Sequence, residues 1–80
     1  MKRRIRAART IKIQVELPIL AVRIRQYRER RLLTQEELGE AVGLTRVQIS
    51  NLERGRHGTN IKTLMDLCDV LDCTADDLLY

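Results

Sequence analysis

Two helix-start signals with a glycine between them constrain the fold of this chain most. Thr34 is followed three residues later by Glu37, and Thr45 is followed three residues later by Gln48. A threonine with a glutamate or glutamine at this spacing forms a capping box, in which each side chain accepts a hydrogen bond from the other residue's backbone amide. Gly43 lies between the two boxes and suits the left-handed conformation that ends a helix. The pattern predicts two short helices joined by a tight turn.

These signals set the bounds of a predicted helix-turn-helix motif over about residues 34–53. The first helix is expected from 35 to about 42, and the second over about 46–53.

Hydrophobic periodicity extends the prediction on both sides of the motif. Residues 10–17 alternate strictly between apolar and polar side chains, which is typical of a half-buried strand. Three further helical segments are expected over about 19–31, about 61–71 and 75–79, the last two capped by Asn60 and Thr74. The side chains expected in the core are Leu20, Ile24, Tyr27, Leu38, Ala41, Val42, Ile49, Leu52, Ile61, Leu64, Cys68 and Leu71. We therefore expect an all-α domain of four to five helices over 18–80, with an arm and β-strand over 1–17.

The distribution of charge indicates a polyanionic partner. The net charge is +4, but residues 1–33 carry eleven basic and only two acidic side chains, whereas residues 61–80 carry one basic and five acidic ones. Twelve of the fifteen basic residues are arginine, which suits phosphates and guanine edges. A solvated charged surface is the alternative, and nucleic acid is favoured over a membrane surface.

Several classes of function are excluded. The chain has one histidine, His57, and two cysteines, Cys68 and Cys73, which do not make a zinc set, so no metal or cofactor is expected. Neither a Gly-rich phosphate loop nor a nucleophile with a nearby base is present, so an enzyme is not expected. The longest apolar run is too short to span a bilayer, and nothing suggests export, so a cytoplasmic protein is expected.

Residues 24–79 resemble the phage-repressor (Cro-like) helix-turn-helix family, also called the xenobiotic-response-element family. The strings that carry the resemblance are Ile24-Arg25, Arg28, Leu33-Thr34-Gln35-Glu36-Glu37-Leu38, Val42-Gly43-Leu44-Thr45, Ile49-Ser50-Asn51-Leu52-Glu53-Arg54-Gly55, Thr63-Leu64 and Leu71-Asp72-Cys73-Thr74-Ala75-Asp76-Asp77-Leu78-Leu79. The resemblance implies a lambda-repressor-like domain. It also implies a sequence-specific regulator of double-stranded DNA, a repressor that acts as a homodimer on a pseudo-palindromic operator.

The resemblance also implies where DNA would be bound. The expected contact residues are Gln35 at the start of the first motif helix, Thr45, Arg46, Val47, Gln48, Ser50 and Asn51 in the second, and Arg54, Arg56 and His57 in the loop beyond. Their chemistry fits base edges: Arg46 can take guanine, Gln48 or Asn51 can take adenine, and Val47 can touch a thymine methyl group. By resemblance, Arg28 and Glu53 form a partly buried pair with a structural role.

Two residues within 24–79 depart from the family pattern. Gly39 stands where alanine is usual, which costs roughly 1 kcal/mol in a helix unless it allows closer packing. Asp72 stands where glycine is common.

The N-terminal segment lies outside the family pattern and needs its own account. A lone strand leaves its backbone groups unpaired, and the rest of the chain offers no other strand candidate. We therefore expect residues 10–17 to pair with the same segment of a second copy and form a homodimer. The alternatives are a disordered basic arm, or an antitoxin-like module whose strand pairs with another protein.

Overall fold

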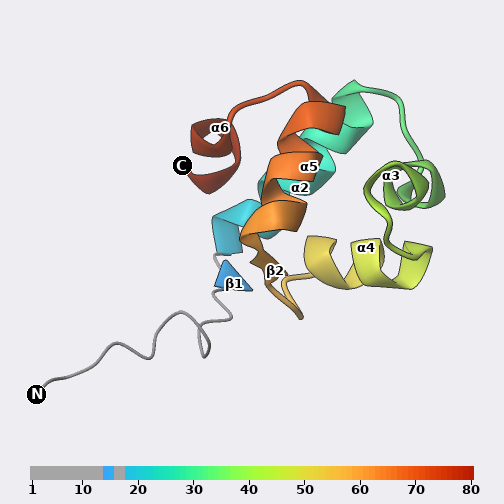
Figure 1. The fold of residues 1–80 in the computed structure, drawn as a ribbon, viewed down its shortest axis with the longest axis horizontal. Helices are drawn as coiled ribbons and strands as arrows, with labels where there is room; N and C mark the ends of the chain where they lie inside the picture. The colour runs from blue at the N-terminus through green and yellow to red at the C-terminus, as the bar shows by residue number, and fades with distance from the viewer. Residues whose placement is uncertain (1–13, 16–17) are drawn as a thin grey trace, which may run out of the picture.

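The computed structural model describes residues 14–15 and 18–80 of the chain. They form five helices and a two-stranded sheet (Figure 1). In chain order the elements are β1 (Gln14–Val15), α2 (Pro18–Arg30), α3 (Gln35–Val42), α4 (Arg46–Glu53), β2 (Thr59–Asn60), α5 (Ile61–Leu71) and α6 (Ala75–Leu79). The fold is thus mostly helical, as the sequence predicts.

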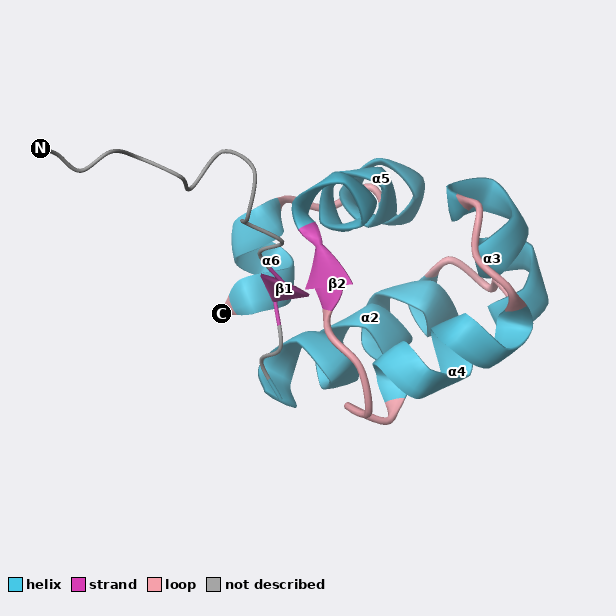
Figure 2. Cartoon of the chain, turned by 60° about the horizontal axis from the view of Figure 1, so that its bottom comes forward, coloured by secondary structure: helices cyan, strands magenta, loops and turns pink. Residues whose placement is uncertain are grey.

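The two predicted capping boxes are present, and they begin α3 and α4 at the predicted residues. Thr34 Oγ1 accepts from the Glu37 amide at 3.0 Å, and Glu37 Oε1 accepts from the Thr34 amide at 2.8 Å. Gly43 ends α3 in the left-handed region, with φ of 76°. Figure 2 shows α3 and α4 joined by this tight turn. The helix-turn-helix motif is therefore confirmed.

Gly39 is required by the way the turn packs. A Cβ atom at this position would lie 2.4 Å from the backbone oxygen of Leu44, which is closer than atoms can approach. The Gly39 carbonyl also accepts the Leu44 amide at 2.8 Å. The glycine therefore allows the backbone at Leu44 to pack closely against α3, which explains why a glycine stands within this helix.

Apolar side chains from all five helices meet in one core. Its buried members are Leu20, Ile24, Leu38, Ile49, Leu52, Leu64, Leu67, Cys68, Leu71 and Leu78. Two predicted core residues are instead exposed, Ala41 and Ile61. Both lie at a helix end, Ala41 as the second-to-last residue of α3 and Ile61 as the first residue of α5.

The N-terminal strand has a partner within the chain, so the expectation that none exists is wrong. β1 pairs antiparallel with β2, with Gln14 opposite Asn60 and Val15 opposite Thr59. The backbone just before α5 is extended, since Asn60 has φ of −85° and ψ of 170° as the N-cap of that helix. A strand of two residues is too short to show alternation, so no pattern there predicts a strand. The remainder of the predicted 10–17 strand lies outside the described residues.

Two helices end in the left-handed conformation without a glycine. Leu32 follows α2 with φ of 59°, and Asp72 follows α5 with φ of 55°. Asp72 therefore occupies the conformation for which glycine is common at this place.

Candidate nucleic-acid interface

α4 is anchored by its inner face and exposes the other. Ile49 is fully buried and Leu52 is 5% exposed, which fixes the helix against the core. On the outer side Val47 is 56% exposed, and Arg46 and Gln48 are also exposed. Ser50 and Asn51 are half-buried one turn further along. A short capped helix whose outer side chains stand free fits a groove of duplex DNA.

The start of α4 is held by the second capping box. The Thr45 amide donates to Gln48 Oε1 at 2.8 Å, and the Gln48 amide donates to Thr45 Oγ1 at 3.1 Å. Both residues were predicted to contact DNA, and the structure shows that each also fixes the first turn of the helix. The amide oxygen of Gln48 is thereby already engaged in the free protein.

Gln35 forms a hydrogen bond to a buried carboxylate at the far end of α4. Its Nε2 donates to Glu53 Oε1 at 3.1 Å. Glu53, whose side chain is 4% exposed, also accepts from Arg28 Nε at 2.6 Å and from Arg28 Nη2 at 3.0 Å. The expected Arg28–Glu53 pair is therefore present, and the hydrogen bonds that Arg28 donates to Glu53 raise the pKa of the Arg28 guanidinium.

Sequence reasoning missed the rest of this network. Arg28 Nη1 donates to the Leu33 carbonyl at 2.8 Å, so one guanidinium holds the segment between α2 and α3 as well as the end of α4. Gln35 and Glu53 are 18 residues apart, and no local pattern links them. The network fixes the start of α3 relative to α4.

A groove of about 380 Å³ runs along one side of α4. Its polar lining comes from Gln48 and Asn51 of α4, from His57 in the loop, and from Asn60 and Thr63 at the start of α5. Of these, Asn60 and Thr63 were not predicted as site residues. The helix-cap signal at Asn60 was visible in the sequence, but its closeness to α4 depends on the fold.

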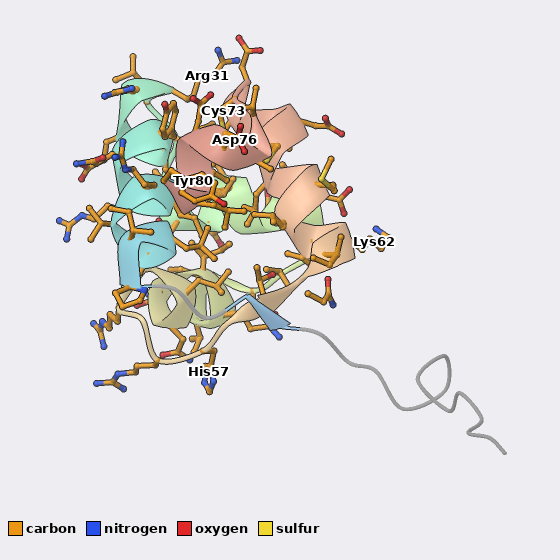
Figure 3. All side chains as sticks on the ribbon, turned by 90° about the vertical axis from the view of Figure 1, so that its left-hand side faces the viewer. Arg31, His57, Lys62, Cys73, Asp76 and Tyr80 are labelled. Carbon is orange, nitrogen blue, oxygen red and sulfur yellow. The ribbon has the colours of Figure 1, made fainter. Side chains whose placement is uncertain are left out.

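The loop after α4 carries the remaining predicted side chains. Arg54, Arg56 and His57 are all exposed. In Figure 3 His57 lies at the opposite end of the molecule from Arg31 and Cys73. Arg54 and Arg56 follow directly after α4, and the Gln35–Glu53 hydrogen bond holds the start of α3 at the same end of that helix.

The two cysteines lie away from α4 and the loop that follows it. Both are free, and burial raises the pKa of each, that of Cys73 to about 12. A thiol that stays protonated is a poor nucleophile and a poor metal ligand. No group of three or more His, Cys, Asp or Glu in the described part of the chain is placed to hold a metal ion. Nor does any helix of residues 18–80 have the length and apolar character needed to cross a membrane.

Comparisons with known proteins agree with this fold. Residues 24–78 match the family model described as Helix-turn-helix. The control protein C.SmaI of Serratia marcescens is 38% identical over 61 residues, which cover 76% of this chain and 73% of that protein.

Two solved structures show the same fold in complexes with DNA. The P22 c2 repressor bound to a synthetic operator is 35% identical, with a TM-score of 0.74 over 78% of this chain and 94% of that one. SinR, the master regulator for biofilm formation, bound to DNA, is 31% identical, with a TM-score of 0.71 over 76% of this chain and 98% of that one. These proteins are DNA-binding regulators and not enzymes, and they do not favour the alternative of a protein-interaction module.

Proposed function

Because the chain belongs to the helix-turn-helix family of DNA-binding regulators, we propose that it is a transcriptional repressor that binds a pseudo-palindromic operator as a homodimer. The observation that carries the proposal is the presentation of α4: Ile49 and Leu52 are buried while Arg46, Val47 and Gln48 stand in solvent. The P22 c2 repressor and SinR, which share the fold, are each bound to DNA. A regulator of this kind acts in the cytoplasm, on the nucleoid.

The DNA contacts divide into two groups by chemistry. Arg46, Val47 and Asn51 on the outer side of α4 would meet base edges, together with Gln48 and Ser50. The other predicted residues, Gln35, Thr45, Arg54, Arg56 and His57, would contact phosphates. The position of Gln35 supports its assignment to a phosphate. It lies in the first turn of α3, where free backbone amides and the helix dipole favour an anion.

The homodimer is proposed because one short helix reads too few base pairs to distinguish an operator in a genome. Residues 10–17 remain the proposed contact. Within the described residues β1 has a neighbour on one edge only, namely β2. The other edge of β1 would pair with β1 of a second copy and extend the sheet across a two-fold axis.

Two measurements test this proposal. Sedimentation of the full chain should give the mass of a dimer, and Ile13→Pro, which removes a backbone donor beside β1, should give a monomer. DNA footprinting should show two half-sites about one helical turn, ~34 Å, apart. A monomeric wild-type chain that protects one half-site would refute the homodimer. If Ile13→Pro stays dimeric, the interface lies elsewhere.

A further inference from the structure

In the free protein the oxygen and the nitrogen of the Gln48 side-chain amide have different surroundings. Its Oε1 accepts the Thr45 backbone amide at 2.8 Å, closing the capping box of α4. The atom that faces Thr45 N–H must be the oxygen, because an N–H group cannot pair with an NH2 group. The Nε2 group therefore points away from Thr45.

That Nε2 group stands free to meet a ligand. Gln48 is exposed, and among the described residues no acceptor takes a hydrogen bond from its Nε2. The residue lies in the first turn of α4, the part of the helix that reaches deepest into a major groove. It lines the groove beside α4 together with Asn51. Two N–H donors are thus presented at the interface without an acceptor beside them.

We infer that Gln48 reads DNA as a hydrogen-bond donor only, through Nε2, while Oε1 stays on Thr45. The inference rests on the proposed function and names the base for one position of the operator. The edge that fits two donors and no acceptor is guanine, which presents O6 and N7. Adenine presents a donor at N6 beside its acceptor at N7, so it would need the amide oxygen as well.

Binding adenine with both amide atoms would open the cap. The Thr45 amide would lose its partner in the first turn of α4, where backbone donors have no acceptor within the helix. The amide of Asn51 is not engaged in this way, since its side chain forms no hydrogen bond within residues 14–15 and 18–80. The adenine contact that the sequence allowed to Gln48 or Asn51 is therefore assigned to Asn51.

Exchange of the amide for a carboxylate tests this assignment. Gln48→Glu keeps an oxygen for Thr45 and replaces the two donors by an acceptor, whereas Gln48→Ala removes both. Duplexes would be selected from a random pool with the full-length wild-type chain and each variant at one salt concentration. The wild-type chain should enrich guanine at one position of each half-site, with a preference of roughly 5- to 150-fold over other bases.

The two variants should then differ at that position alone. Gln48→Glu should enrich cytosine or adenine there, because N4 and N6 are donors, and Gln48→Ala should show no preference. Urea unfolding should give Gln48→Glu a midpoint no lower than that of the wild type and Gln48→Ala a lower one. The matched control is Glu37→Gln, the reverse exchange at the same position in the capping box of α3, which should leave the selected sequence unchanged.

Two results would overturn the inference while leaving the proposed function standing. One is adenine at this position in the wild-type selection, lost in Gln48→Ala, which would mean that the oxygen leaves Thr45 on binding. The other is the same selected sequence for all three chains, which would make Gln48 a capping residue only. If the wild-type chain enriches no duplex, the proposed function fails together with the inference, and this outcome is distinct from the other two.

Discussion

At the scale of single residues, Glu53 links α2, α3 and α4 from a buried position. Its two carboxylate oxygens accept from Arg28 and from Gln35, and the side chain is almost fully buried. The sequence allowed the Arg28–Glu53 pair to be expected through the family resemblance. The Gln35 bond could not be predicted, because it depends on how α3 and α4 are packed.

Loss of Arg28 should therefore be costly. Arg28→Ala leaves the buried carboxylate of Glu53 without its cation, and we expect the free energy of unfolding to fall by ~3–5 kcal/mol. Urea denaturation followed by circular dichroism measures the change. The matched control is Arg25→Ala, which breaks the Arg25–Glu29 pair of the same helix. Those side chains are 64% and 56% exposed, so the control should cost at most about 0.5 kcal/mol. Equal losses would show that Glu53 does not depend on Arg28.

The outer residues of α4 and the loop beyond it should affect DNA binding in different ways. Arg46→Ala should lower the affinity for the operator by ~1–3 kcal/mol and leave binding to random duplex almost unchanged, because a base contact is lost. Arg56→Ala should weaken binding to both duplexes alike, because a phosphate contact carries no sequence information. Fluorescence anisotropy titrations with both duplexes measure this. If Arg46→Ala lowered the affinity for the operator and for random duplex equally, α4 would not read bases.

At the scale of elements, caps were the features that the sequence predicted best. The residues that cap α3, α4, α5 and α6 are local signals, and each helix begins at the predicted residue. The pairing of β1 with β2 joins residues that are 44 and 46 positions apart in the sequence, and neither strand is longer than two residues. Strand β2 was not predicted because the extended backbone at the N-cap of α5 has no periodic pattern in the sequence.

The packing of α3 against the turn gives a prediction that reverses a general rule. Glycine to alanine in a helix interior ordinarily gains about 1 kcal/mol. Gly39→Ala should instead destabilise the protein by ~1–3 kcal/mol, because the new Cβ would meet the Leu44 carbonyl oxygen. The control is Glu40→Ala, the next residue along and exposed, which should change the free energy of unfolding by no more than about 0.5 kcal/mol. Thermal unfolding of both variants provides the comparison. A stabilised Gly39→Ala protein would mean that the turn can relax.

At the scale of the whole molecule, the distribution of charge can be read from the sequence, whereas the way in which two copies would associate cannot. The basic first part of the sequence and the acidic last part are properties of composition, and they pointed to a polyanion before any fold was considered. The proposed dimer contact is residues 10–17, of which the structure describes only Gln14–Val15. Those two residues are already paired within the chain, so the argument that they must find a second copy no longer holds.

The central claim is that this chain reads the sequence of double-stranded DNA. The measurement that tests it most directly is the dissociation constant for the selected duplex and for a shuffled duplex of the same composition, followed over a range of salt concentrations. We expect nanomolar to micromolar binding to the selected duplex at low salt, at least roughly 1,000-fold tighter than to the shuffled one. Both affinities should fall steeply as salt rises, because phosphate contacts release counterions. Equal affinity for the two duplexes, or no binding to either at low salt, would contradict the claim.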